Sequence, residues 1–162
     1  MDAGKPLGLS PGSPNRIRRI EGGVLDFGAD MTPAENPLEL GMERLVNFDK
    51  RDFIGKPALE KIRSEGITRK MAGVFMDGDI FHKNNENRWP VYSQSNPVGE
   101  VTSAVYSPRL EKNIGFALLE IEHAETGNVL TVDTPEGQRR LEVTTMPFID
   151  PEKVLPRKSL RQ

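Results

Sequence analysis

The second half of the chain has the hydrophobic pattern of short β-strands. After Gly66, segments rich in β-branched and aromatic residues recur, and each is bounded by turn residues. The last two segments alternate apolar and polar positions on either side of residues 134–137, which is the pattern of a β-hairpin. Residues 67–149 are therefore expected to form an antiparallel barrel or sandwich of at least five strands, over 70–76, 98–106, 114–121, 129–132 and 141–145.

Two helices are expected ahead of this strand-rich region. Residues 56–65 place Leu59 and Ile62 on one face, have a proline in the first turn, and are followed by a glycine that stops the helix. A shorter helix over residues 16–21 ends at Gly22-Gly23. The chain is thus expected to belong to the α+β class.

The remaining segments give weaker patterns. Residues 1–15 are rich in glycine and proline, show no apolar period, and are expected to form a loop. Apolar positions between residues 40 and 48 are interpreted as a strand. The basic, proline-broken tail over residues 151–162 is expected to lie on the surface.

Composition and charge exclude several classes of protein. The chain has no cysteine, so it has no disulfide framework, thiolate metal site or cysteine nucleophile. With 22 Lys+Arg against 24 Asp+Glu it carries a formal net charge of −2, which gives no electrostatic footprint for nucleic acid. No apolar run approaches the roughly 20 residues of a membrane helix, and no secretory signal is visible, so the cytoplasm is the expected compartment.

The two histidines offer little chemistry. His82 and His123 fall in different turn regions, without a second ligand or a nucleophile at a useful spacing, and both are interpreted as surface residues. No metal ligand is therefore predicted. The chain also lacks the glycine-rich loops that hold nucleotide phosphates.

Two charged residues are better candidates for ligand binding. Glu21 lies between a cluster of arginines and Gly22-Gly23, where its carboxylate could accept two N–H donors from a flat heterocycle such as a pterin or guanine. The alternative is that Glu21 pairs with Arg18 or with a lysine of a neighbour. Arg109, in a polar loop between two predicted strands, could hold a carboxylate or phosphate, or be a solvated arginine.

Seven segments form an ordered series along the chain: RIEGG (19–23), FGADM (27–31), NPLELG (36–41), DFIGKPAL (52–59), GEVTS (99–103), SPRLEKNIG (107–115) and MPF (146–148). In this order and at this spacing they resemble the C-terminal half of the glycine cleavage T-protein family, the tetrahydrofolate-dependent aminomethyltransferases and their demethylase relatives. The dimethylsulfoniopropionate demethylase-like branch is the most similar.

The resemblance implies a layout of three lobes around a central folate pocket, the third lobe being a β-barrel. Residues 67–150 would be that barrel domain. Residues 1–66 would be part of the folate-binding second lobe with its linker helix, and residues 151–162 a surface tail. The implied cofactor is tetrahydrofolate.

The resemblance also assigns site residues. The family glutamate that hydrogen-bonds the pterin ring corresponds to Glu21. The folate-associated arginine ahead of the FIG-type motif corresponds to Arg51, with Lys50 as the fallback. Arg109 is added as a third candidate folate contact, because the glutamate tail of folate needs a cation. No residue of this chain is assigned a catalytic role.

The implied reaction is transfer of a one-carbon unit from an N- or S-methyl or aminomethyl donor to tetrahydrofolate. In the family the first lobe supplies the catalytic aspartate and most of the donor pocket, and nothing in residues 1–15 resembles it. The chain alone is therefore expected to be inactive, and its expected partners are folate, a small methylated donor, and the N-terminal lobe or another subunit. The alternative is a non-enzymatic β-barrel module that binds another protein. A nucleic-acid-binding barrel is disfavoured by the charge and the few aromatic residues.

Overall fold

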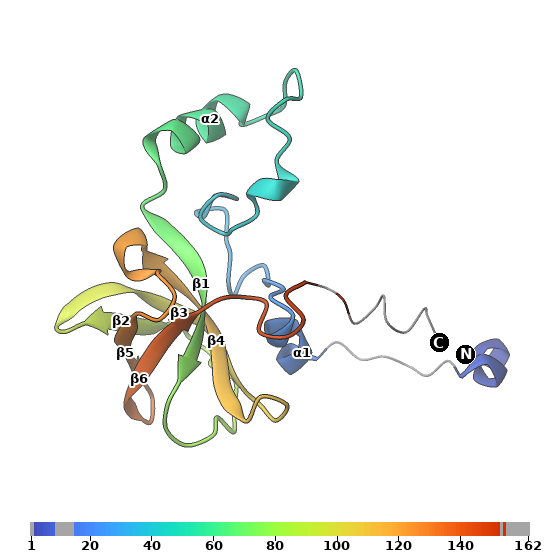
Figure 1. The fold of residues 1–162 in the computed structure, drawn as a ribbon, viewed down its shortest axis with the longest axis vertical. Helices are drawn as coiled ribbons and strands as arrows, with labels where there is room; N and C mark the ends of the chain where they lie inside the picture. Colours follow the sequence, from blue (N-terminus) through green and yellow to red (C-terminus); the bar gives the residue numbers. More distant parts are fainter. Residues whose placement is uncertain (1, 9–14, 153, 155–162) are drawn as a thin grey trace.

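The computed structural model describes residues 2–8, 15–152 and 154. Within them, the strands form one closed antiparallel barrel in the order β1-β4-β3-β2-β5-β6, and β1 closes it by pairing with both β4 and β6 (Figure 1). The strands are β1 (Arg69–Met76), β2 (Trp89–Ser93), β3 (Asn96–Ser107), β4 (Lys112–Glu120), β5 (Val129–Thr134) and β6 (Gly137–Thr144).

The apolar side chains of the barrel form two buried clusters. All six strands contribute to the inner cluster, which includes Val74, Val101 and Leu141. The outer cluster covers the opposite face of β1, β3 and β4, where Ile20 from the first helix packs with Phe116. Seven consecutive residues of β4 are buried for this reason, since each face of that strand meets one cluster. Full burial of Ile20 contributes about 1.5–3 kcal/mol to the docking of its helix.

Strands β3 and β4 approach each other closely at one glycine. A Cβ at Gly115 would lie 2.4 Å from the carbonyl oxygen of Ser103, which is closer than real Cβ contacts. The register of the two strands shifts between Val101 and Ser103. Such a bulge turns the backbone and re-aims the side chains beside it, and it lies under the first helix.

The helix α1 (Arg16–Glu21) begins and ends at the residues expected from the sequence. The side chain of Asn15 caps its first turn by accepting from the backbone N–H groups of Ile17 and Arg18 at 2.8 and 3.3 Å. Gly22 follows its last residue. The helix lies across the outside of β3 and β4 (Figure 1).

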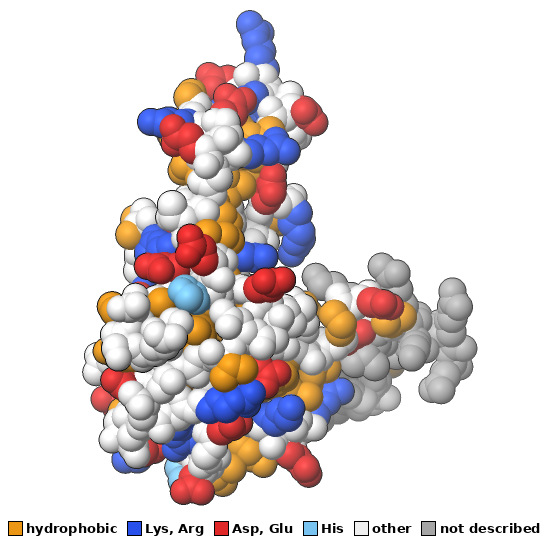
Figure 2. Space-filling view, turned by 60° about the vertical axis from the view of Figure 1, so that its left-hand side comes forward, with side chains coloured by type: hydrophobic (Ala, Val, Ile, Leu, Met, Phe, Trp, Pro, Cys, Tyr) orange, Lys and Arg blue, Asp and Glu red, His pale blue; other side chains and the backbone are white. Residues whose placement is uncertain are grey.

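The helix α2 (Lys56–Glu65) confirms the second helical prediction, with Gly55 and Gly66 at left-handed backbone positions on either side of it. None of its residues is buried, and it lies away from the barrel at the far end of the molecule (Figure 1). Charged side chains of both signs cover this end (Figure 2). None of the helices that the structure describes is long and apolar enough to cross a membrane.

Three local predictions were wrong or incomplete. Residues 40–48 form turns and the short 3-10 helix η2 (Glu43–Leu45) instead of a strand, because local bonds such as that from the Met42 N–H to the Pro37 carbonyl replace strand pairing. The 3-10 helix η1 (Asp2–Leu7) occupies part of the expected N-terminal loop. Strand β2 was not predicted. A further 3-10 helix, η3 (Ile121–His123), follows β4.

Candidate functional site

A cavity of about 510 Å³ lies between the C-terminal end of α1 and the loop that joins β3 to β4. We call it the Glu21 cavity. Its walls combine one carboxylate and two arginines with aliphatic side chains, which are able to cover a flat ring. The lining residues are Asn15, Ile17, Arg18, Glu21, Gly22, Pro108, Arg109 and Ile149.

Glu21 is held at both its backbone and its side chain. It is the last residue of α1 and only 6% exposed. Its carbonyl oxygen accepts from the backbone N–H groups of Phe148 and Ile149, at 3.0 and 3.2 Å. Its carboxylate oxygen Oε1 accepts from the hydroxyl of Ser107 at 2.5 Å. These contacts fix the carboxylate in the wall of the cavity.

The second oxygen of this carboxylate is available to a ligand. Among the described residues, Oε2 of Glu21 accepts no hydrogen bond, and Glu21 forms no ion pair with Arg18. In the part of the chain that the structure describes, Nε of Arg16 is the single side-chain nitrogen or oxygen that is fully buried and has no hydrogen-bond partner. Oε2 of Glu21 also has no partner but is not fully buried, so it retains access to the cavity. The structure thus shows an acceptor without a partner in place of the expected alternative, a Glu21–Arg18 pair.

The sequence-predicted site residues are only partly brought together. Arg109 is exposed and lines the same cavity as Glu21. Arg51 is exposed in the segment ahead of α2 and does not line this cavity, and Lys50 lies beside it with its carbonyl accepting from Lys56 Nζ at 2.7 Å. Of the three predicted contacts, Glu21 and Arg109 thus line one cavity and Arg51 does not.

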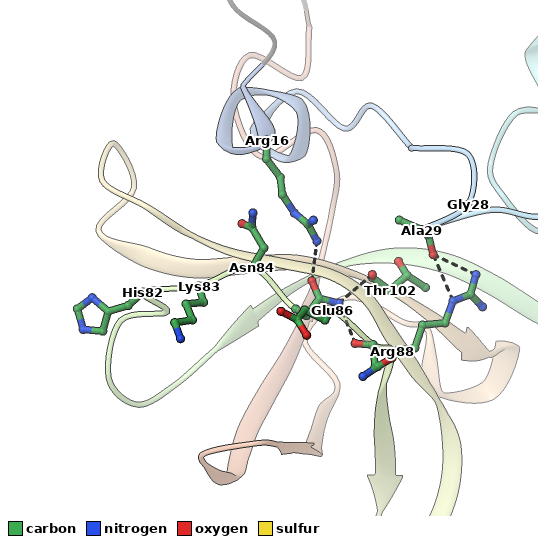
Figure 3. Close-up of a pocket in the computed structure, with 11 residues that line it drawn as sticks. Arg16, Gly28, Ala29, His82, Lys83, Asn84, Glu86, Arg88 and Thr102 are labelled. Carbon is green, nitrogen blue, oxygen red and sulfur yellow. Dashed lines mark hydrogen bonds between the residues drawn. The ribbon is translucent and has the colours of Figure 1, made fainter.

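A larger cavity of about 790 Å³ lies on the other side of α1 (Figure 3), and we call it the Asn85 cavity. Basic and amide side chains dominate its walls. Arg16 points from α1 toward the barrel, while His82 and Lys83 lie on the loop between β1 and β2. The lining residues are Arg16, Gly28, Ala29, His82, Lys83, Asn84, Asn85, Glu86, Asn87, Arg88 and Thr102.

Asn85 uses its whole side-chain amide inside the protein. Its oxygen accepts from Arg16 Nη2 at 2.7 Å and from the backbone N–H of Ala104 at 2.8 Å. Its amide nitrogen donates to the carbonyls of Thr102 and Asn87, at 3.0 and 3.1 Å. An amide side chain has two donors and two acceptor sites, so no position is left for a ligand.

The guanidinium of Arg88 also bonds to other groups of the protein. It donates to the carbonyl of Ala29 at 3.1 and 3.2 Å (Figure 3). It also pairs with Glu100 at 2.5 Å and with Glu35 at 3.5 Å. Burial lowers the pKa of Arg88, but the hydrogen bond and charge of Glu100, followed by those of Glu35, outweigh burial and raise it above its ordinary value. Arg16 has a lowered pKa, because it is desolvated and lies near the charge of Arg19.

A buried ion pair fastens α1 to the barrel between the two cavities. Arg19 pairs with Asp30, whose side chain is fully buried. Asp30 also accepts from the Thr102 hydroxyl at 2.7 Å and the Asp26 N–H at 2.9 Å, and Arg19 donates to the Ser103 hydroxyl at 2.9 Å. The sequence reasoning missed Asp30, Asn85 and Ser107, although Asp30 and Ser107 lie within two of the seven ordered segments.

The histidines lie apart from the Glu21 cavity. His82 is exposed at the rim of the Asn85 cavity, and His123 is half-buried after β4. Among residues 2–8, 15–152 and 154, no group of three or more His, Cys, Asp and Glu residues is placed to hold a metal ion.

Comparison with known proteins decides the family. Residues 69–150, which span the barrel, match the model of the glycine cleavage T-protein C-terminal barrel domain. The chain belongs to this family. The resemblance drawn from the seven segments is confirmed, and so is the prediction of an α+β chain with a C-terminal antiparallel β-barrel.

Relatives of this T-protein family chain include two kinds of enzyme. The chain is 33% identical over 141 residues to a dimethylsulfoniopropionate demethylase of Ruegeria pomeroyi, which covers 87% of this chain and 38% of the relative. It is 36% identical over 135 residues to an aminomethyltransferase of Caldanaerobacter subterraneus subsp. tengcongensis, covering 82% and 35%. The chain thus spans less than half the length of these curated relatives.

A solved structure shares the fold. The glycine cleavage system aminomethyltransferase T from Bartonella henselae superposes with a TM-score of 0.74 at 20% identity. The match covers 83% of this chain and 37% of that one, so the shared fold extends beyond the barrel strands.

Proposed function

We propose that this chain forms the folate-binding C-terminal part of a tetrahydrofolate-dependent aminomethyl- or methyltransferase. One observation carries the proposal. Glu21, at the position assigned to the pterin by resemblance, is a buried carboxylate with one oxygen hydrogen-bonded inside the protein and the other open to a cavity. The membership of the chain in the T-protein family supports the class of reaction.

The Glu21 cavity suits a pterin in its chemistry. A pterin presents an N–H and an amino group side by side, and one carboxylate accepts both. Ser107 uses one acceptor site of Oε1, so both oxygens of Glu21 retain sites for these donors. Ile17 and Ile149 offer apolar surface to the ring. The volume of about 510 Å³ lies in the range of roughly 300–1,000 Å³ that is typical of small-molecule sites.

The chain's own residues would bind and orient the cofactor. Glu21 holds the pterin, and Arg109, which lines the same cavity, attracts the carboxylates of the glutamate tail. Bound tetrahydrofolate supplies the nitrogen that receives the one-carbon unit. The protein contributes mainly position, which lowers the entropic part of the barrier. Arg51 stays a predicted folate contact, and the proposal does not depend on it.

The donor pocket and the catalytic carboxylate are assigned to a part outside this sequence. The relatives are more than twice as long as the segment matched here. Apolar side chains near α1 support a partner surface, because Val24 is 58% and Phe27 69% exposed. The proposed partner is a lobe equivalent to the N-terminal part of the relatives, which brings a small methylated or aminomethylated donor.

Calorimetric titration of tetrahydrofolate tests the proposal, with the chain alone and with the N-terminal lobe of a relative added. Glu21→Ala is expected to weaken binding by about tenfold or more, because hydrogen bonds to a charged group are worth about 1.5–3 kcal/mol. Arg109→Ala is expected to weaken it by less than about fivefold, because this cation is exposed.

The variant Glu21→Gln keeps the shape of the side chain and separates ligand binding from folding. It is expected to unfold at the wild-type temperature and still to bind tetrahydrofolate weakly, since its amide opposes the pterin donors. Equal effects of the Glu21 and Arg109 substitutions would contradict the assignment. Absence of binding by the wild-type chain under both conditions would favour the non-enzymatic interaction module.

A further inference from the structure

Ser107 connects Glu21 to the loop between β3 and β4. We propose that Ser107 is a positioning residue, which sets the orientation of the Glu21 carboxylate and, through the same hydroxyl, the conformation of the loop that carries Arg109. This inference rests on the proposed folate site. It adds the group that aligns the carboxylate with the two pterin donors.

The direction of the hydrogen bonds follows from the groups involved. The Ser107 hydroxyl lies 2.5 Å from Glu21 Oε1 and 3.2 Å from the backbone nitrogen of Leu110. The Leu110 N–H is a donor, so the hydroxyl oxygen accepts from it. An ionised carboxylate only accepts, so the single hydroxyl hydrogen of Ser107 points to Glu21. One hydroxyl therefore serves both partners, and each contact fixes the other.

The position of Ser107 makes this bond persistent. Ser107 is the last residue of β3 and is fully buried, so water does not replace it as a donor to Glu21. The backbone of Glu21 is already fixed by Phe148 and Ile149. The remaining freedom is the rotation of the carboxylate, and the bond to Ser107 removes it. Oε2 is then held open to the cavity before a ligand arrives.

The hydrogen bond from the Leu110 N–H to Ser107 shapes the loop that carries Arg109. By accepting from Leu110, Ser107 closes a turn that spans Pro108 and Arg109. Both of these residues line the Glu21 cavity. The same hydroxyl thus bonds the carboxylate and closes the turn that carries Arg109, so two lining residues of the cavity depend on one side chain.

Three ligands separate this role from a general effect on folding. Tetrahydrofolate contains both the pterin and the tail, a tetrahydropterin contains the ring alone, and p-aminobenzoylglutamate contains the tail alone. The affinity of each is measured by calorimetry under the conditions that give wild-type binding of tetrahydrofolate. Ser107→Ala is expected to weaken both pterin-containing ligands about tenfold, since the carboxylate loses its alignment. The tail fragment is expected to change by less than about threefold, because even removal of the exposed Arg109 side chain is expected to cost less than about fivefold.

Ser103→Ala is the matched control. Ser103 is also a fully buried serine of β3, but its hydroxyl accepts from Arg19 and makes no contact with Glu21. This variant is expected to lose stability and to keep the wild-type affinity for all three ligands. In a Glu21→Gln background, Ser107→Ala is expected to cause little further loss of affinity for the pterin, because the two residues act as a unit.

The outcomes distinguish this inference from the proposed function. Wild-type binding of the tetrahydropterin with an unchanged affinity in Ser107→Ala would overturn the positioning role and leave the folate site standing. An equal loss for all three ligands, or an additive loss in the Glu21→Gln background, would also overturn it. If the wild-type chain binds neither pterin-containing ligand, with or without the added lobe, both proposals fail.

Discussion

The two cavities beside α1 differ in how the buried side chains at their centres, Asn85 and Glu21, use their hydrogen-bonding groups. The Asn85 cavity is larger and has more polar groups in its walls, but Asn85 and Arg88 bond to other parts of the protein. The Glu21 cavity is smaller and contains a buried carboxylate with one free oxygen. A buried carboxylate oxygen that is open at a fixed position favours the Glu21 cavity as the ligand site, although Nε of Arg16 in the wall of the Asn85 cavity also has no partner.

The difference has a structural origin in the way α1 docks. The face that carries Arg16 and Arg19 is bonded to the barrel through Asn85 and Asp30. At the end of the helix, the hydrogen bonds of Glu21 run to Ser107 at the end of β3 and to the segment after β6, so one carboxylate oxygen stays open. Substitutions on the first face should affect stability, and substitutions at the end of the helix should affect ligand binding.

The largest effect is expected for Asp30→Ala. The change leaves the Arg19 guanidinium without its buried partner, and breaking a buried pair in this way costs about 3–5 kcal/mol. The free energy of unfolding in urea measures the loss. Asp26→Ala is the control, because its side chain is exposed, and it should change stability by less than about 0.5 kcal/mol. Similar values for the two variants would contradict the role of the pair in holding α1.

A smaller effect is expected for Asn85→Ala. This variant leaves the Ala104 N–H, the Thr102 carbonyl and Arg16 without a partner, which costs about 1–3 kcal/mol. The neighbouring and exposed Asn84→Ala serves as the control in the same unfolding experiment. If folded Asn85→Ala bound tetrahydrofolate ten times more weakly than the wild type, the contrast between the two cavities would be broken.

The smallest effect is expected for Glu35, whose contribution to the free energy of unfolding depends on pH. Burial raises the pKa of Glu35, but hydrogen bonds from Thr32 and the charge of Arg88 outweigh it and hold the pKa below its ordinary value of 4.5. A carboxyl group with a lowered folded-state pKa stabilises the fold above its unfolded pKa, and this contribution disappears as the pH falls through the folded value. The variant Glu35→Gln lacks this contribution. At pH 6 its free energy of unfolding should therefore be below that of the wild type, by no more than about 1 kcal/mol.

Unfolding measured between pH 6 and pH 3 checks this sign. The difference between the wild type and Glu35→Gln should shrink below pH 4.5, where the wild-type carboxyl begins to be protonated. The exposed Glu125→Gln provides the comparison. A difference that grew toward acid would show that the bonds to Thr32 and Arg88 do not stabilise the ionised form.

Local patterns in the sequence predicted most of the elements but few of the site contacts. The two helices and the β5–β6 hairpin follow from side-chain period, capping residues and turn residues that lie close together in the chain. Strand β2 has only five residues and contains Pro90, so its pattern is too short to read.

The site depends on contacts between distant parts of the chain. Ser107 is 86 residues from Glu21, and Asn85 is 69 residues from Arg16. Such pairs follow from the packing of α1 on the barrel, which no local period encodes. The resemblance to the family predicted Glu21 as the pterin contact. It did not show which oxygen of the Glu21 carboxylate is free.

The isolation of α2 makes this helix a natural reporter of assembly. A helix of ten residues is marginal in water when none of its residues is buried. The ion pair, cation–π contact and hydrogen bond that link the side chains of α2 to other described residues run to the segment before it, from Arg63 to Glu43 and Phe48 and from Lys56 to Lys50. The two ion pairs along α2, Lys56–Glu60 and Lys61–Glu65, add only a few tenths of a kcal/mol each. Its amide hydrogens should therefore exchange with solvent far faster than those of β4, which is covered on both faces. Slow exchange in α2 would be the first sign that another lobe has docked.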